Sequence, residues 1–266
     1  MKKLFISSFH TLCVLMVIIT SSHPAVAHDG FSPEALEATS QVLHLSINHG
    51  CNGKSVIAQS VIFPTRNPIL KGVDDNGNEV PAPTDLAEII ETQSIEGLST
   101  LIQERNIFLD QNNKINELGN NIGFYGKKGR LKEGLLGKVA FQYFGPFFIP
   151  NTCVKALHIE TAIADICSTK PPALQEGKVS LFIPDNGSRI AAEARANGLS
   201  HGIGEPSILK VVRNLESNPF RDANGKPSKA CGKGITVKVT PSAEDIDKNL
   251  PIPGYWPVNK KHSQQD

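Results

Sequence analysis

The first 27 residues set the strongest limit on how this chain can fold, because they indicate that it leaves the cytoplasm. Two lysines precede the apolar run 4–20, and Ala-Val-Ala occupies positions 25–27. A positive segment, an apolar segment and an A-x-A site together are typical of a secretory signal peptide. The apolar run is short for a membrane span, and no second such run follows, so we expect no transmembrane segment after signal removal. The expected product is an exported protein that begins at His28.

Export to an oxidising compartment determines how the cysteines should be interpreted. The chain after residue 27 holds four of them, Cys51, Cys153, Cys167 and Cys231. An even number of cysteines in an exported protein favours disulfides, here two, and four cysteines allow three connectivities. The wide spacings lack the C-x-x-C pattern of metal and redox sites.

Composition and charge remove several classes of protein. Of 266 residues, 39% are hydrophobic and 20% are charged, which is typical of a folded chain. Lys and Arg number 27 against 26 Asp and Glu, so no basic excess points to a nucleic-acid partner. With 22 Gly, 18 Pro and few helix-favouring runs, a long helical bundle is not expected.

Short alternating segments indicate a mainly β fold. Alternation of apolar and polar residues, or a concentration of β-branched and aromatic ones, predicts strands over six segments. These are 43–47, 55–63, 139–149, 157–166, 178–183 and 208–215, and a further alternating strand is expected over 235–239. Apolar residues at helical spacing predict one or two short helices within 85–110, and the polar, Gly-rich stretch near 123–137 is expected to be a solvated hairpin loop. We expect a β-sandwich with a helical insertion.

The same pass along the chain suggests how it is divided. Residues 1–27 are the signal peptide, and residues 28–172 are expected to form the sandwich domain. The Pro-Pro pair at 171–172 marks the boundary of a C-terminal β-rich extension, 173–258. The polar tail 259–266 is expected to be disordered.

His28 is the residue with the clearest chemical potential. An N-terminal histidine offers one metal ion both an α-amine and an imidazole nitrogen. The reference pKa of the α-amine is near 8, so losing its proton costs little at neutral pH. Nitrogen donors of this kind suit Cu(II). A histidine at this position can also arise by chance.

At this point the sequence resembles a family, the YcnI-like copper-binding proteins of bacterial envelopes. Residues 28–170 carry the resemblance. His28 is followed by Ser32-Pro33, a strand, and the turn His49-Gly50-Cys51. Further on, an aromatic strand leads into Phe147-Phe148-Ile149-Pro150-Asn151-Thr152-Cys153, similar to a family segment that also ends in cysteine.

The resemblance implies an immunoglobulin-like β-sandwich holding one copper ion. The family ligands are the N-terminal histidine, a carboxylate on the next strand and a tryptophan. Gln41 stands near the carboxylate position, with Glu34 and Glu37 close by. No tryptophan lies soon after the second cysteine, since the sole one, Trp256, is far along the chain. His44 or His158 could supply an imidazole instead, although each is out of phase with its apolar neighbours, which favours a solvated position.

The resemblance also implies a disulfide pairing. Cys51 and Cys153 match two family positions, so they are expected to pair with each other. Cys167 and Cys231 would then connect the C-terminal extension to the first domain, and the competing connectivities stay open.

Two functions follow from these observations. The first is an exported copper-binding protein, periplasmic or at the cell surface, that scavenges, buffers or delivers copper through His28, with His44 and His158 as further candidate ligands. Its partners would be the copper ion and a membrane copper transporter or envelope protein. The second is a metal-free envelope sandwich with a structural or protein-interaction role. No G-x-S-x-G, H-E-x-x-H or EF-hand pattern is present, so an enzyme is not expected.

Overall fold

The computed structural model describes residues 29–48, 50–65 and 67–258. The signal peptide, His28, His49 and the tail 259–266 lie outside this range, so the expectations about them stay predictions. The first nine strands are β1 (Gly30–Ser32), β2 (Ala35–Leu36), β3 (Ser40–Ile47), β4 (Ala58–Ile62), β5 (Ile69–Val73), β6 (Glu79–Val80), β7 (Ser99–Leu101), β8 (Phe108–Ile115) and β9 (Asn121–Gly129). The remaining elements are β10 (Gly137–Phe144), β11 (Val154–Ile166), β12 (Val179–Phe182), β13 (Ser207–Val212), β14 (Ile235–Thr240), the 3-10 helix η1 (Leu86–Glu88), α1 (Arg189–Ala196) and α2 (Ala243–Asn249).

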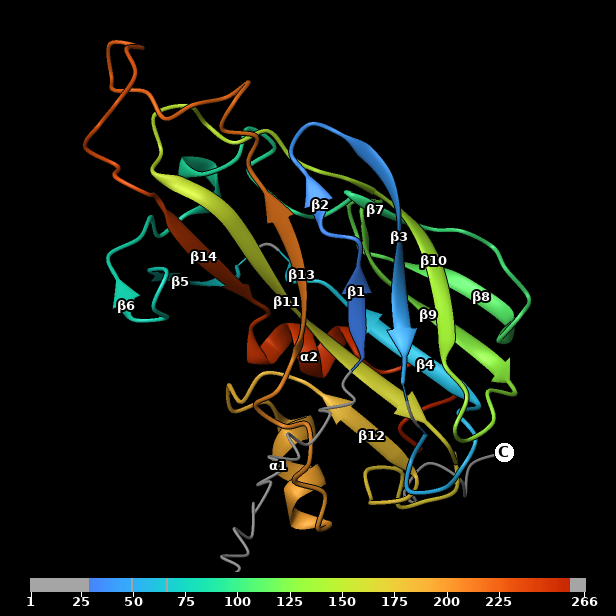
Figure 1. The fold of residues 1–266 in the computed structure, drawn as a ribbon. Helices are drawn as coiled ribbons and strands as arrows, with labels where there is room; N and C mark the ends of the chain where they lie inside the picture. Colours follow the sequence, from blue (N-terminus) through green and yellow to red (C-terminus); the bar gives the residue numbers. More distant parts are fainter. Residues whose placement is uncertain (1–28, 49, 66, 259–266) are drawn as a thin grey trace, which may run out of the picture.

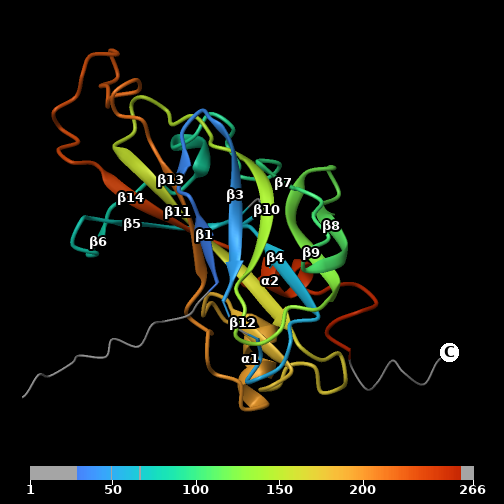
Figure 2. The same cartoon turned by 45° about the vertical axis from the view of Figure 1, so that its right-hand side comes forward.

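Two sheets face each other across a shared core. The smaller sheet has the strand order β1-β3-β10-β7, and the main path of the larger one is β6-β5-β14-β11-β4-β9-β8. In β3, Leu43, Leu45 and Ile47 are fully buried while the residues between them are only partly buried. These inward residues pack with buried residues of β4, β9 and β11 in one cluster. Figures 1 and 2 show β1, β3 and β10 lying across β11 and β4, and the expected mainly β sandwich is confirmed.

The strand β11 organises the larger sheet. Its 13 residues include the expected central strand 157–166. The first half of β11 pairs with β13 in antiparallel and with β14 in parallel orientation. The second half pairs with β4 and β12, both antiparallel. Strands from both sides of residue 172, the expected domain boundary, are therefore hydrogen-bonded to the same strand.

The Gly-rich stretch 123–137 was expected to be a hairpin loop, but its first half belongs to strand β9, which pairs with β8. A Cβ atom on Gly126 would lie 2.4 Å from the ring of the buried Phe108, and one on Gly129 would lie 2.6 Å from it. These glycines therefore leave space for an aromatic side chain on the neighbouring strand. Glycine normally weakens a strand prediction, which is why the sequence pattern favoured a loop here. Only residues 130–136 form the connection to β10.

Residues 85–110 also differ in part from expectation. Asp85 caps the single-turn helix η1, since its side chain accepts a hydrogen bond from the Ala87 backbone amide. Ser99–Leu101 joins the edge of the smaller sheet as β7, and β8 begins at Phe108. The helical contribution of this segment is thus one short turn.

A second core lies on the other face of β11 and β4. Ala162, Ala164 and Ile166 of β11 point into it, opposite to Ile163. Helices α1 and α2, capped by Ser188 and Ser242, cover this face together with the last described segment. Trp256 is 1% exposed there, so the Pro-rich stretch around it helps to close the second core.

The disulfide pairing implied by the family resemblance is wrong. The bonds are Cys51–Cys167 and Cys153–Cys231. Cys153 and Cys167 flank β11 on its two sides, and 13 extended residues span about 40 Å. Cys231 precedes β14, which runs parallel to β11 with Ile235 beside Val154, so it reaches Cys153. The length of β11 therefore decides which cysteines can meet.

Candidate functional site

Of the histidines proposed as metal ligands, the two that the structure describes, His44 and His158, lie in different sheets. His28 lies outside the described residues. His44 is partly exposed on β3, where it pairs with Ser32 and Ala140 in the smaller sheet. His158 is partly exposed on β11 in the larger sheet. No group of three His, Cys, Asp or Glu side chains suited to a metal ion is found within residues 29–48, 50–65 and 67–258.

The side chains near the family's carboxylate position have other roles. The Gln41 side-chain oxygen accepts hydrogen bonds from the Leu36 amide and the Thr39 hydroxyl at 2.7 and 3.0 Å. Glu34 forms an ion pair with Lys210 at 3.1 Å. Glu37 is buried and accepts from the Phe148 and Asn214 backbone amides at 2.7 and 2.8 Å. These residues stabilise the β2–β3 region.

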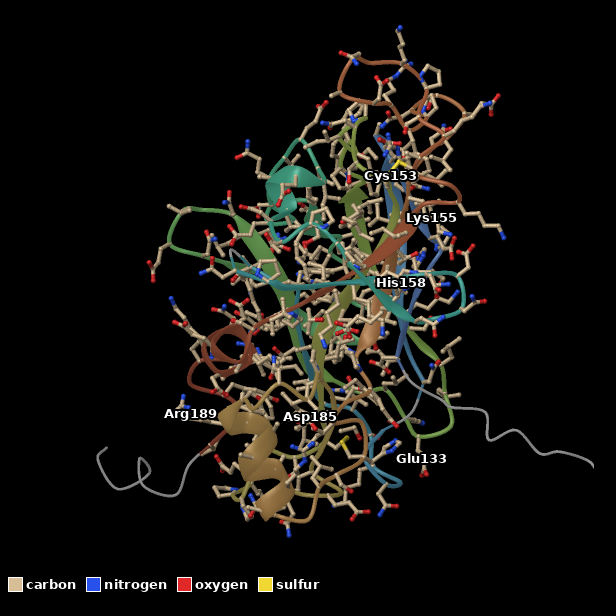
Figure 3. All side chains as sticks on the ribbon, turned by 90° about the vertical axis from the view of Figure 1, so that its left-hand side faces the viewer. Glu133, Cys153, Lys155, His158, Asp185 and Arg189 are labelled. Atoms are coloured by element: carbon tan, nitrogen blue, oxygen red, sulfur yellow. A yellow bond between two sulfur atoms is a disulfide. The ribbon has the colours of Figure 1, made fainter. Side chains whose placement is uncertain are left out.

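Four basic residues form a row on the outer face of the larger sheet, and we call them the charged row. Lys71 on β5 pairs with Lys238 on β14, which pairs with His158 on β11, which pairs with Lys210 on β13. Directly paired residues project from the same face of a sheet, and neighbouring strands lie about 4.8 Å apart, so the row spans about 14 Å. Figure 3 views this side of the molecule and labels His158 along β11, beyond Lys155 and Cys153.

The ends of the charged row are neutralised and its centre is open. Lys71 lies 4.0 Å from Glu79 at one end, and Lys210 lies 3.1 Å from Glu34 at the other. Among the described side chains, no acid lies within ion-pair distance of Lys238. Burial lowers the pKa of His158, and the charges of Lys210 and Lys238 lower it further. A neutral imidazole at neutral pH can donate one hydrogen bond and accept another.

A second polar cluster is sealed inside the sandwich, and the sequence analysis did not anticipate it. Asp29, Gln59 and Asp165 are 2%, 1% and 0% exposed. The Gln59 side-chain nitrogen donates to both carboxylates, to Asp29 at 3.0 Å and to Asp165 at 2.8 Å. Asp29 also accepts from the Asn48 backbone amide at 3.2 Å. The single signal in the sequence is the acid at position 165 within the otherwise apolar segment 162–166 of β11.

Burial governs the ionisation of this carboxyl pair. Removal from water raises the pKa of Asp165 to about 7. Burial, followed by repulsion from Asp165, holds the pKa of Asp29 well above its usual range. One Asp165 oxygen lacks a hydrogen-bond donor among the described groups, which suits a proton held between the two carboxyls. A proton shared by the two carboxyls would relieve their repulsion, and both side chains are closed off from solvent.

The acidic segment 74–78 is a turn. The Asp74 carboxylate accepts from the Asn76 and Asn78 backbone amides at 2.8 and 2.9 Å, and Gly77 has a φ of 81°. Asp222 makes the same pattern with the Asn224 and Lys226 amides, both at 2.9 Å. These oxygens accept hydrogen bonds from the chain's own backbone amides, which fix both turns.

Comparison with known proteins adds little to this picture. No protein-family model matches the chain, and no curated protein matches it. Among solved structures, a type II cohesin domain from the cellulosome of Acetivibrio cellulolyticus is similar over 71% of this chain and 95% of that domain, with 12% sequence identity and a TM-score of 0.24. Over the described part of the chain, no helix has the length and apolar character needed to cross a membrane.

Proposed function

We propose that the protein is an exported, non-catalytic β-sandwich that binds an acidic segment of a protein partner through the charged row. The observation that carries this proposal is the alignment of Lys71, Lys238, His158 and Lys210 on four hydrogen-bonded strands. Two disulfides stabilise the sheet that presents them, as suits a protein outside the cytoplasm.

Without a bound partner, the charged row lowers the stability of the folded protein. Like charges directly opposite each other on neighbouring strands destabilise a sheet. Glu79 and Glu34 offset this cost only at the two ends, and Lys238 lacks a described acidic neighbour. A carboxylate from a partner, placed between Lys238 and His158, would accept hydrogen bonds from both and relieve the repulsion.

The acidic residues beside the charged row favour a partner with one or two carboxylates over a large polyanion. Glu160 lies two residues from His158 on the same strand and accepts from the Thr240 hydroxyl at 2.7 Å. Asp75 is ion-paired with Lys155 and lies 4.0 Å from Lys233. The surroundings of the row are therefore mixed in charge, which repels a dense polyanion and selects for spaced acidic groups.

Calorimetric titration with a hexaglutamate peptide at low ionic strength tests the proposal. The protein should bind the peptide, and Lys238→Gln combined with His158→Gln should weaken binding about tenfold, which corresponds to about 1.4 kcal/mol. Lys170→Gln, at an exposed lysine outside the charged row, is the matched control and should leave the affinity unchanged. Absence of binding, or equal weakening by the control, would refute this function.

Copper binding through His28 stays as a second proposal. Its support is the sequence alone, namely a histidine directly after Ala-Val-Ala and the resemblance to YcnI-like proteins. His158 is a poor additional ligand, because Lys210 and Lys238 on either side would repel a cation. His44 lies on β3 of the smaller sheet, where it pairs with Ser32 of β1, so it stays a candidate further ligand of the copper ion.

EPR spectroscopy with copper stoichiometry tests this second function. The correctly processed protein should give a type-2 Cu(II) signal with nitrogen coupling at one copper per chain. One extra residue placed before His28 should abolish that signal, since it separates the α-amine from the imidazole. His158→Gln should leave the signal intact. If neither form binds copper tightly, the copper proposal fails and the partner-binding proposal is unaffected.

A further inference from the structure

A short loop outside the charged row presents two exposed leucines. The segment 130–136 joins β9 to β10, and within it Leu135 and Leu136 are 56% and 59% exposed. The Leu135 backbone amide donates to the Lys132 carbonyl at 3.2 Å, which closes a turn at the tip of the loop. Gly134, with a φ of 74°, lies inside this turn.

The base of this loop is fixed to the sandwich. Leu131 is 8% exposed, and its carbonyl accepts from the Val56 amide at 3.0 Å. On the other side, a Cβ atom on Gly137 would lie 2.8 Å from Leu131 and 2.9 Å from Ile107. Because the base of the loop is closely packed, the exposure of Leu135 and Leu136 does not result from an incompletely packed core. They project from an anchored turn.

Basic residues surround the exposed leucines. Lys128, Arg130, Lys132 and Lys138 are all exposed, and none has an acidic partner within ion-pair distance among the described residues. The acid within the loop is Glu133, whose carboxylate lies 3.5 Å from the position of a Cβ atom on Gly53. Four cations, one acid and two exposed leucines therefore lie within residues 128–138.

The tip lies at one end of the molecule. In Figure 3, Glu133 is at the same end as Asp185 and Arg189, and Cys153 is at the opposite end. Figure 1 shows that the loops between β13 and β14 project from the Cys153 end. The loop therefore lies away from those projections, at the end of the molecule that also carries α1.

Another exposed leucine has different surroundings. Leu118, in the β8–β9 turn, is 62% exposed. Its neighbour Glu117 forms an ion pair with Lys248 at 3.1 Å, and Glu96 binds the side chains of Asn116 and Asn120. The cleft beside this turn also contains Glu244 and Asp245. Leu118 thus lies among acidic residues, whereas basic residues flank Leu135 and Leu136 along the chain.

We infer that the β9–β10 loop docks the protein on an anionic lipid bilayer. Leu135 and Leu136 would enter the boundary between headgroups and acyl chains, as apolar residues of interfacial segments do. Lys128, Arg130, Lys132 and Lys138 would contact lipid phosphates, since basic groups near an anionic membrane surface are attracted to it. This site is separate from the charged row and does not depend on the proposed function.

Vesicle sedimentation tests the inference. The protein should bind vesicles of phosphatidylcholine with about 30% phosphatidylglycerol and should not bind phosphatidylcholine alone. Lys128→Gln with Lys132→Gln should lower the partition coefficient about 25-fold, roughly fivefold for each lysine. Leu135→Ser with Leu136→Ser should lower it about tenfold. Leu118→Ser and Lys238→Gln are the matched controls and should leave binding unchanged.

A fluorescent reporter distinguishes insertion from simple attraction. Trp256 is buried, so Leu136→Trp would supply the emission that responds to the bilayer. A blue shift with anionic vesicles, not displaced by millimolar glycerol phosphate, would support docking on the membrane. Displacement by glycerol phosphate would show that the loop binds a soluble anion and would overturn the inference. Vesicle binding that is equal in the loop variants and the controls would overturn it as well.

Discussion

The two ends of β11 bury charged groups in opposite ways. At one end, next to the Cys51–Cys167 disulfide, Asp29 and Asp165 share one amide donor, Gln59. At the other end, next to Cys153–Cys231, the 3% exposed Arg213 has a large set of acceptors. Its nitrogens donate to the carbonyls of Pro150, Thr152, Val154, Asn218 and Pro219 and to the Asn218 side chain, at 2.8 to 3.2 Å.

This difference shows that burial alone does not determine how a charged residue behaves. Arg213 keeps its charge because carbonyl oxygens replace the water it lost, and its guanidinium lies 4.9 Å from the Phe220 ring. Asp29 and Asp165 have too few donors for two negative charges, so they are expected to hold a proton. One end of β11 should therefore be insensitive to pH and the other sensitive.

Removing the guanidinium should have the largest effect on stability. Arg213→Met would leave several buried carbonyls without donors, and we expect a loss of about 3–5 kcal/mol in the free energy of unfolding. Urea denaturation measures this loss. Arg213→Lys should recover only part of it, because an ammonium has three donors where the guanidinium has five.

A matched control is Arg195→Met, which removes an exposed guanidinium paired with Asp185 at 2.7 Å. The midpoint of urea denaturation should stay close to that of the unaltered protein. If Arg213→Met is no more damaging than Arg195→Met, the acceptor set around Arg213 does not stabilise this end of β11.

Replacing one acid should stabilise the opposite end at high pH. The pKa of Asp165 is about 7 in the folded protein and near 3.9 when unfolded, so folding takes up protons between these values. The contribution to stability is complete below pH 4 and is lost as the pH rises through 7. The linkage amounts to on the order of 4 kcal/mol between pH 4 and pH 8. Asp165→Asn should remove most of that dependence and raise stability at pH 8.

Thermal unfolding across this pH range, together with urea denaturation, measures the difference. Asp222→Asn, in an exposed turn, is the control and should retain the pH dependence of the unaltered protein. A parallel pH profile for Asp165→Asn and the unaltered protein would mean that the buried pair does not hold a proton.

A smaller change tests whether the Arg213 end depends on acceptors more generally. Glu37 accepts from the Phe148 and Asn214 amides and from the Asn218 side chain, at 2.6 to 2.8 Å. Glu37→Gln would replace one acceptor oxygen with a donor that faces other donors, and we expect a loss of about 1–3 kcal/mol. Glu91→Gln, on the exposed surface, should change stability little. Equal values for the two variants in urea denaturation would contradict this role.

The sequence predicted the strands better than their partners. Alternation in 43–47 and 235–239 predicted β3 and β14, because a half-buried strand needs apolar residues on one face only. The pattern could not show that β14 pairs with β11 in parallel, since this pairing joins residues far apart in the chain. The implied pairing of Cys51 with Cys153 failed for the same reason, as it depended on where β11 ends.

The candidate sites show the same contrast between features set by the local sequence pattern and features set by strand pairing. The exposed positions of His44 and His158 were foreseen from their phase relative to apolar neighbours, and both are partly exposed. The charged row was not foreseen, because Lys71, Lys238 and Lys210 meet His158 only through the order of the strands. Gln59 and Asp165 are likewise opposite each other through the pairing of β4 with β11. Side chains that meet across strands leave no local signal in a single sequence.

The two disulfides allow a further comparison of the two ends of β11, because the stability that each contributes is expected to differ only slightly. Cys51–Cys167 closes a separation of 116 residues, and Cys153–Cys231 one of 78. In the chain-entropy model the stabilisation grows with the logarithm of loop length, so these bonds should differ by only about 0.4 kcal/mol. Two double variants remove the bonds separately, namely Cys51→Ala with Cys167→Ala and Cys153→Ala with Cys231→Ala. They should destabilise the protein almost equally in urea at pH 4, where the acid pair is protonated.

At pH 8 the ionised carboxyls add strain at the Cys51–Cys167 end, where the Cys51 sulfur contacts the Asp165 carbonyl. Loss of that disulfide should then be the more damaging of the two, because it fixes the strand that carries Asp165. Equal losses at both pH values would show that the disulfide and the acid pair act independently.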